Sequence, residues 1–406
     1  MDCGRTYRSR GHRLYLPLKF SGRTDWPRVR NRLTQILESK KKSGAPLIDL
    51  TESNPTRCGF GYLTPELLKP LSDPGNLAYE PDPHGLRKAR EEICGYYSEK
   101  GVSLHADQIF LTAGTGEAYA FLFRLLCDPG DPVLLPRPGY PLLDYLADLN
   151  DVKPVFYDLS YQDAWRMDEK SFPKHFFKTK AVLVVNPNNP TGNYVTREES
   201  AFISGVCLKN QCAVISDEVF FDFSWEGSNQ ERKSFAGCAD ALSFTLGGLS
   251  KFLGLPQMKL GWIVVNGPRK EKEEAIQRLE IIADTYLSVN TPVQNALPVW
   301  FQNYKGIIRE IRERCLQNRR FLTQALEAAK PVRLLGGEGG WYAMLSLGGF
   351  VSDGSLAVRL LEEYNVLLHP GYFFNTGSGR EIVLGLLSPA PVFREGVERL
   401  LKCLHF

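Results

Sequence analysis

Apolar residues along this chain occur in short blocks that alternate with longer segments of mixed polarity. From residue 109 onward a block of apolar residues is followed by a polar loop and then by a segment with helical spacing, and the order repeats. This order is typical of strands joined by crossover helices in a mostly parallel sheet. It predicts strands at residues 109–112, 133–136, 181–185, 213–216, 242–246 and 261–265, and helices at 117–126 and 197–209.

The last third of the chain has a different pattern. Charged segments with helical spacing at 272–287 and 298–329 precede two strand-like runs, at 336–345 and 380–387, and an amphipathic segment at 393–403. We therefore predict an α/β fold with a large domain, whose mostly parallel central sheet is flanked by helices, and a smaller α/β domain built from the chain ends. The predicted parts are an N-terminal arm and small-domain helix over 1–45, a large domain over 46–290 and a C-terminal small domain over 291–406.

Composition narrows the class of protein. The 406 residues carry 49 Lys and Arg against 46 Asp and Glu, a net charge of +3 that is too balanced to favour a nucleic acid or an anionic membrane as partner. Nine scattered cysteines without a CxxC pair favour reduced thiols and a cytoplasmic location. None of the six histidines falls in a ligand cluster, so we expect no metal.

The N-terminus is basic, with Arg5, Arg8, Arg10 and Arg13, but its apolar run at 14–18 is short and contains Pro17. This argues against a signal peptide and favours an arm, and no stretch approaches the ~18 apolar residues of a membrane span.

The predicted strands end in loops rich in Gly, Pro, Asn, Ser and Asp, which should converge because ligands of open α/β sheets bind at the carboxyl ends of the strands. The strongest local signal is LGGLSKFLGLPQMKLGW at 246–262, where Lys251 follows a strand in a Gly/Ser loop. Desolvation there would favour the neutral amine that Schiff-base chemistry needs. Taken alone, a surface lysine in a glycine loop is the more common explanation.

Two more strand ends carry polar side chains. Asn189 lies in NPNNPTG (186–192), where its amide can bond to an oxygen on a ring, and Asp217 leaves the strand before VFFDF. A buried carboxylate is unfavourable without a cationic partner, and a pyridinium nitrogen would be suitable. Each residue alone is equally compatible with a structured loop, a helix N-cap or a salt-bridged core aspartate.

Two further loops complete the set. In LTAGTGEAYAF (111–121) the backbone N–H groups of Gly114, Thr115 and Gly116, with the dipole of the following helix, form an anion site suited to phosphate. In PRPGYPLLD (136–144) a Pro-Gly turn presents Tyr140, whose ring could lie flat on an aromatic ligand, although packing is its commoner use.

In this order the five segments resemble fold-type I, pyridoxal-phosphate-dependent aminotransferases of class I/II, over most of the chain from about residue 50 to residue 401. The resemblance implies pyridoxal 5'-phosphate as cofactor and a ping-pong transfer of an amino group between an amino acid and a 2-oxo acid. Lys251 would hold the cofactor as an aldimine and move the Cα proton, Asp217 would pair with the ring nitrogen, Asn189 would bond the phenolic oxygen and Tyr140 would stack.

The resemblance assigns the remaining roles as well. The phosphate would be bound by Gly114, Thr115, Gly116, Ser250 and Lys259. Tyr79, in LAYEPDPHGLRKAREEI, would reach the phosphate of a neighbouring subunit and thereby imply a homodimer. Ser53, in LTESNPT, and Asn189 would contact the substrate.

The chain departs from the family pattern at several positions. Phe220 and Gly248 stand where hydroxyl residues are usual, and Lys259 stands where arginine is usual. Val383 occupies the expected position of the arginine that binds the substrate α-carboxylate. The nearest arginine, Arg380, would point to the opposite face of the strand unless a bulge intervenes, so it enters the predicted substrate site only on that condition.

These departures keep two alternatives open. One is another chemistry on the same scaffold, namely β- or γ-elimination, a synthase reaction or an oxidase reaction. The other is a catalytically inactive regulator that binds DNA, which the short segment before residue 47 disfavours because it holds no helix-turn-helix pattern.

Overall fold

The structure is a computed structural model that describes residues 18–61, 65–173, 178–225, 232–302, 304–327, 329–349 and 351–405. The basic residues Arg5, Arg8, Arg10 and Arg13 lie outside the described residues, as does all but the last residue of the apolar run at 14–18. Among the described helices none is long and apolar enough to cross a membrane.

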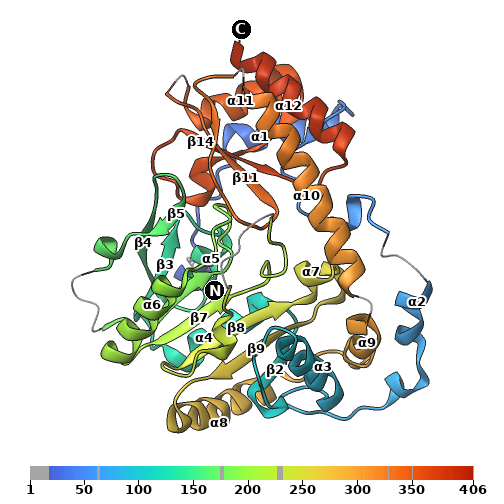
Figure 1. Cartoon of the computed structure of the whole chain (residues 1–406), viewed down its shortest axis with the longest axis vertical. Coiled ribbons are helices and arrows are strands. Elements are labelled where there is room, and N and C mark those ends of the chain that lie inside the picture. The colour runs from blue at the N-terminus through green and yellow to red at the C-terminus, as the bar shows by residue number, and fades with distance from the viewer. Residues whose placement is uncertain are drawn as a thin grey trace, which may run out of the picture.

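In the described part of the chain the strands form one large and two small sheets (Figure 1). The large sheet has the order β2-β9-β8-β7-β6-β3-β4-β5. Its core is parallel, whereas β9 runs antiparallel to both β2 and β8, and β5 antiparallel to β4. The bounds are β2 (Ile109–Thr112), β3 (Pro132–Arg137), β4 (Lys153–Tyr161), β5 (Trp165–Met167), β6 (Ala181–Val185), β7 (Ala213–Asp217), β8 (Ser243–Gly248) and β9 (Gly261–Asn266).

Alternation along the strands explains why helices cover both faces of this sheet. On β6, Val182 and Val184 pack with residues of α6, whereas Ala181, Leu183 and Val185 pack on the opposite face in the cluster formed with α4 and α8. A strand buried on both faces reads as a continuous apolar run, which is the pattern seen in the sequence. The helices around the large sheet are α3 (Arg87–Ser98), α4 (Thr115–Leu126), α5 (Leu142–Leu149), α6 (Arg197–Asn210), α7 (Leu249–Phe252), α8 (Arg269–Tyr286) and α9 (Thr291–Gln302).

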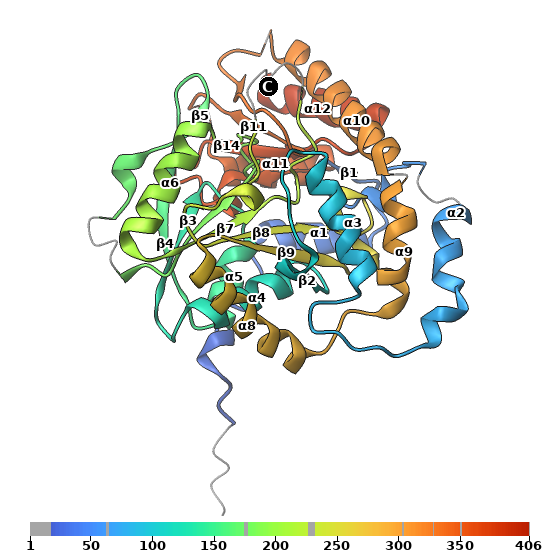
Figure 2. The same cartoon turned by 60° about the horizontal axis from the view of Figure 1, so that its bottom comes forward.

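The chain ends build a smaller lobe, at the top of Figure 1. Its antiparallel sheet has the order β10-β11-β14-β13, and the parallel pair β1-β12 joins residues 48–49 to residues 366–367. The long helix α10 runs between the two lobes, and α2 lies at the periphery in both views (Figures 1 and 2). The bounds are α1 (Arg32–Lys42), β1 (Ile48–Asp49), α2 (Pro65–Leu68), α10 (Tyr304–Leu326), β10 (Arg333–Leu334), β11 (Tyr342–Ser346), α11 (Asp353–Tyr364), β12 (Val366–Leu367), β13 (His369–Pro370), β14 (Glu381–Gly385) and α12 (Ala390–His405).

The predicted fold class is confirmed, and the six predicted strands correspond to β2, β3, β6, β7, β8 and β9. The prediction of a helix that begins at Pro298 was wrong, because Pro298 lies inside α9, which begins at Thr291. There the Asn290 side chain accepts from the N–H of Val293, as an N-cap residue does. The hairpin of β4 and β5 was not predicted, and the domain boundaries near residues 45 and 290 stay predictions.

The junction between α10 and the end of β14 depends on one buried side chain. The Asn318 amide nitrogen donates to the carbonyl oxygens of Leu386, at 2.9 Å, and Ser388, at 2.8 Å, and the side chain is almost fully buried. Both carbonyls follow β14, so this contact fixes the exit of the strand against the helix.

We predict that Asn318→Ala lowers the free energy of unfolding by about 2 kcal/mol or more, because two buried carbonyls lose their donor. Chemical denaturation followed by tryptophan fluorescence measures the effect. The exposed neighbour Gln317, replaced by alanine, is the control and should change stability by less than about 0.5 kcal/mol. Equal stability of the two variants would show that this junction does not depend on Asn318.

Candidate active site

The loops that carry the predicted site residues meet at one edge of the large sheet. Parallel strands β3, β6, β7 and β8 all end there. Tyr140, Asn189 and Lys251 follow β3, β6 and β8, and Asp217 is the last residue of β7. Because β9 runs in the opposite direction, its first residues reach the same edge, and Gly261 pairs with both Thr112 and Gly248. The topology therefore brings Lys259, which precedes β9, to the edge where β2 ends.

Lys251 is a largely buried lysine at this edge. Its Nζ lies 5.1 Å from the ring centroid of Trp341 and 5.6 Å from that of Phe220. Among the residues that the structure describes, its amine has no hydrogen-bond or ion-pair partner. Burial lowers the pKa of the Lys251 amine to about 8, although the nearby Asp217 carboxylate acts in the opposite direction. A lysine in this state supplies far more neutral amine near pH 7 than an exposed one.

Asp217, the last residue of β7, is a buried carboxylate with two donors. The Tyr119 hydroxyl donates to Oδ2 at 2.8 Å, and the backbone N–H of Val219 donates to Oδ1 at 3.1 Å. Burial nevertheless raises the pKa of Asp217, so these donors and Lys251 do not fully compensate for the lost hydration. The site can therefore bind a further cation or proton donor beside this carboxylate.

Sequence reasoning missed Tyr119. This residue lies in α4 within the apolar run AYAFLF, where a buried tyrosine looks the same as a packing residue. Only the position of its hydroxyl on Asp217 distinguishes it. Burial and the Asp217 charge raise the pKa of Tyr119 well above its usual value, so the hydroxyl stays a donor at physiological pH.

The tyrosine in the Pro-Gly turn lies beside the same carboxylate. Tyr140 is 37% exposed, and both burial and the Asp217 charge raise its pKa. Tyr342, on β11, lies beside the Ser53 side chain, and burial raises the Tyr342 pKa to about 12. The ring of Tyr342 lies 6.3 Å from that of Phe220, which also contacts Lys251. Ser53 of the small lobe thus reaches the group formed by Lys251, Asp217 and Tyr140.

Several buried polar atoms at the site have no partner among the described residues. They include Oδ1 of Asn189, Nε1 of Trp341 and Oγ1 of Thr245. Such atoms are rare in folded proteins, because each loses its bonds to water on burial. The side-chain amide of Asn189 therefore has capacity left for a ligand at this edge of the sheet.

The turn before α4 leaves open space above its backbone. Gly114 has a φ of 146°, and a Cβ built on either Gly114 or Gly116 would meet no atom within 4 Å. Behind the turn the packing is tight, since a Cβ on Gly261 would lie 3.0 Å from Gly114. The free N–H groups at the start of α4 make this turn a suitable anion site. Ser250 is partly buried beside it in α7, and Lys259 is exposed.

Two predicted site residues lie apart from this group. Tyr79 is 72% exposed in the single chain, in the segment that follows α2. The Arg380 guanidinium lies beside Gly349, in the loop after β11. Arg380 directly precedes β14, which begins at Glu381. Tyr342 pairs with Gly385, at the opposite end of that strand, and five strand residues span ~17 Å. The structure therefore does not bring Arg380 to Lys251.

The residues that do come together fit pyridoxal phosphate. A largely buried amine suits its aldehyde, a buried carboxylate suits its ring nitrogen and an open turn at a helix N-terminus suits its phosphate. The amide N–H of Asn189, which has no partner among the described residues, suits its phenolic oxygen as a donor. No group of three or more His, Cys, Asp or Glu side chains placed to hold a metal ion occurs in the described ranges.

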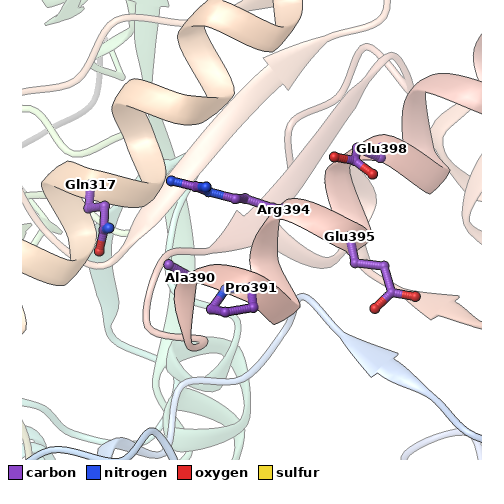
Figure 3. Close-up of a pocket in the computed structure, with 6 residues that line it drawn as sticks. All are labelled: Gln317, Ala390, Pro391, Arg394, Glu395 and Glu398. Carbon is purple, nitrogen blue, oxygen red and sulfur yellow. The ribbon is translucent and has the colours of Figure 1, made fainter.

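A separate groove lies on the surface between α10 and α12 (Figure 3). Its volume is about 510 Å³, and the Arg394 side chain extends from α12 toward Gln317 on α10. We call Tyr140, Asn189, Asp217 and Lys251, at the ends of the parallel strands, the strand-end group. None of the residues that line the groove belongs to it, so the groove is distinct from the candidate active site.

The fold and the strand-end group define an enzyme class that works on amino groups. The family model "Aminotransferase class I and II" matches residues 45–387. The chain therefore belongs to the class I and II aminotransferase family and is a transaminase, an enzyme that moves an amino group between an amino acid and a 2-oxo acid. Members of this family use pyridoxal phosphate.

Individual relatives agree with this assignment. The glutamate-pyruvate aminotransferase AlaA of Haemophilus influenzae is 27% identical over 377 residues, which are 90% of this chain and 92% of the relative. An alanine aminotransferase of Mycobacterium tuberculosis is 26% identical over 385 residues, 92% of this chain and 89% of the relative. The solved structure of an Escherichia coli aminotransferase has a TM-score of 0.86 at 24% identity and covers 96% of this chain and 98% of its own, which supports the fold.

The lowered pKa of Lys251 predicts an unusual pH profile of reactivity. We expect acetylation of Lys251 by limiting acetic anhydride in the cofactor-free protein to rise about tenfold per pH unit and to level off above about pH 8, because only the neutral amine reacts. Peptide mass spectrometry measures the modification, with a lysine model peptide as reference.

Asp217→Asn serves as the matched variant for this profile. Removal of the carboxylate should move the midpoint to lower pH, because the Asp217 charge raises the Lys251 pKa in the native chain. A midpoint above pH 10 in the native chain would mean that the Lys251 amine is not desolvated.

Proposed function

We propose that this transaminase holds pyridoxal phosphate covalently on Lys251 and works by a ping-pong mechanism, in which the donor leaves as a 2-oxo acid before the acceptor binds. The observation that carries the proposal is the largely buried, unpartnered amine of Lys251 beside the buried carboxylate of Asp217. When bound, pyridoxal phosphate supplies an aldehyde that takes up the amino group and an electron-poor ring that stabilises negative charge on Cα.

The side chains of this chain divide the remaining work. Lys251 moves the proton at the substrate Cα, since its amine has a pKa near neutrality. Asp217 keeps the ring nitrogen protonated, and the Tyr119 hydroxyl at 2.8 Å keeps that carboxylate ionised and oriented. Tyr140 covers the ring, and Asn189 bonds its phenolic oxygen and contacts the substrate together with Ser53.

The phosphate is assigned to the turn before α4. The backbone of Gly114, Thr115 and Gly116, the Ser250 hydroxyl and the Lys259 amine are the donors in this proposal. The open space at Gly114 and Gly116 supports it. Lys259 contributes a point charge to this cradle, because an amine cannot form the two parallel bonds of a guanidinium.

The names of the relatives suggest which substrates to test first. The names of the two relatives above refer to alanine, glutamate and pyruvate. We therefore propose L-alanine and L-glutamate as donors, with pyruvate and 2-oxoglutarate as acceptors. We place the reaction in the cytoplasm, which is supported by the free state of the eight cysteines that the structure describes.

A single-turnover experiment tests the proposed function. Purified protein loaded with the cofactor should release one equivalent of 2-oxo acid per chain from L-alanine or L-glutamate without any acceptor, and it should then stop. Added acceptor should restart the reaction. Continuous release of ammonia, with no dependence on an acceptor, would instead favour an eliminating enzyme. Lys251→Ala, which lacks the amine, is the control and should release no oxo acid.

We also propose that two copies of the chain form a homodimer in which Tyr79 binds the phosphate held by the partner. Large apolar side chains in the same part of the chain and on α8 support it, since they are exposed in the single chain. Leu77 is 91% exposed and Ile281 is 70% exposed. Large apolar side chains that are exposed in a single chain can be covered by a partner subunit.

Tyr79→Phe is expected to weaken retention of the cofactor by about tenfold, because the phosphate loses one charge-assisted hydrogen bond from the partner. Equilibrium dialysis of the cofactor measures the effect. The partly exposed Tyr286, replaced by phenylalanine, is the control and should leave retention unchanged. Unaltered retention in Tyr79→Phe, or a chain that stays monomeric, would exclude the shared phosphate site.

A further inference from the structure

The substrates of a transaminase carry a carboxylate that the described residues around Lys251 do not match with an arginine. Arg380 lies beside Gly349, and Val383 is fully buried in an apolar cluster with Trp165 and Met344. A carboxylate bound away from water needs hydrogen-bond donors or a positive charge. Another hydrogen-bond donor or cation is therefore needed near Val383 to bind the substrate carboxylate.

A histidine lies on the same face of the small sheet. In the register of β13 and β14, His369 is directly opposite Val383, and Val383 is directly opposite Met344 of β11. Residues directly opposite each other on neighbouring strands point to the same side of a sheet. Residues two apart on one strand also share a face, so Tyr342 lies on this side as well. His369, Val383 and Met344 thus form a row on the face that carries Tyr342.

Ring contacts connect His369 to the candidate active site. Its ring centroid lies 5.6 Å from that of Phe374, and the Phe374 ring lies 6.4 Å from that of Tyr342, which lies beside Ser53. The carbonyl oxygen of Phe374 accepts from the N–H of Gly139, which directly precedes Tyr140. His369 therefore lies at the border of the group formed by Tyr342, Ser53 and Tyr140.

The imidazole of His369 is available for a ligand. The side chain is partly buried, and within the described ranges its ring nitrogens have no hydrogen-bond or ion-pair partner. The ring nitrogens of His369 are not among the fully buried polar atoms without a partner in the described ranges, so a ligand that enters from solvent can reach them. A histidine in the protein interior is otherwise commonly held by a backbone or side-chain acceptor.

We propose that His369 binds the α-carboxylate that amino acid and 2-oxo acid substrates share, in place of an arginine. This inference rests on the proposed function for the identity of the ligand. The imidazole donates an N–H to the carboxylate and, when protonated, adds a positive charge. Specificity for carboxylated substrates then depends on pH, which a guanidinium would not cause.

The charged groups around His369 define this pH dependence. Burial lowers the His369 pKa from its usual 6.5, and the Asp49 carboxylate on β1 opposes this effect. On α11, Asp353 is already occupied by the backbone N–H groups of Gly354 and Tyr372, and Glu381 on β14 is bonded to Ser378. Asp49, which accepts from the backbone N–H and the hydroxyl of Thr51, is the charge that acts on the His369 imidazole. A bound carboxylate would raise the His369 pKa further.

The pKa shifts of His369 determine how the affinity for a 2-oxo acid changes with pH. A ligand that raises the pKa of His369 binds the protonated form more tightly, so binding takes up a proton. The affinity for a 2-oxo acid is highest below the His369 pKa of the free protein. It falls as pH rises from that value to the higher pKa of the complex, and it is constant above it.

Calorimetric binding of pyruvate and 2-oxoglutarate tests the proposal. The protein is used after borohydride reduction of its cofactor, so that neither acid can react and binding is measured without turnover. In native protein, binding near pH 6.5 should take up a proton, which is detected by comparing buffers of different ionisation enthalpy. His369→Leu should weaken both acids about 10- to 100-fold, because a hydrogen bond to a charged group is lost.

His369→Gln separates a ligand role from a structural one. Glutamine keeps an N–H donor but cannot titrate, so this variant should bind within a few-fold of the native protein at pH 8 and should take up no proton. The exposed His105, replaced by glutamine, is the control and should change neither quantity. Unchanged affinity in His369→Leu, or equal proton uptake in His369→Gln, would overturn the proposal.

The experiments distinguish a wrong role for His369 from a wrong proposed function. If the native protein fails the single-turnover assay but binds both acids with proton uptake at His369, transamination as proposed is wrong and the carboxylate site stands. If the native protein transaminates and His369→Leu binds as tightly as the native chain, transamination stands and the role of His369 is wrong.

Discussion

A buried amine without a partner is unfavourable in a folded protein, and the structure of this chain is arranged around one. Lys251 is surrounded by Trp341 and Phe220, and burial lowers its pKa to about 8. Asp217 is buried nearby with a raised pKa, although Tyr119 and Val219 donate to it. The charged forms of both groups are less stable than they would be in water. A ligand that pairs with them recovers the free energy lost on burial.

The sheet topology makes this arrangement possible. Parallel strands place the loops with Tyr140, Asn189, Asp217 and Lys251 at one edge, and the reversal of β9 brings the turn before α4 and Lys259 to the same edge. The small lobe faces the site through Tyr342, whose ring lies 6.3 Å from that of Phe220, beside Lys251. The site thus depends on contacts between parts of the chain that are far apart in sequence.

Local patterns were sufficient to predict the residues at the strand ends. The apolar blocks gave β2 and β6 with the bounds that the structure has, and the loops after the strands were expected to converge. The hairpin of β4 and β5 was missed, because β4 is only partly buried and lacks a continuous apolar run. The contact of Tyr119 with Asp217 and the position of His369 could not be predicted either, since they depend on a hydroxyl across the core and on the register between two strands.

Mass spectrometric mapping of the cofactor tests the central claim most directly. The protein is incubated with pyridoxal phosphate, reduced with borohydride and digested, and the modified lysine is located by peptide sequencing. The account predicts a single stoichiometric adduct on Lys251. An adduct on another lysine, or a protein that takes up no cofactor, would contradict it.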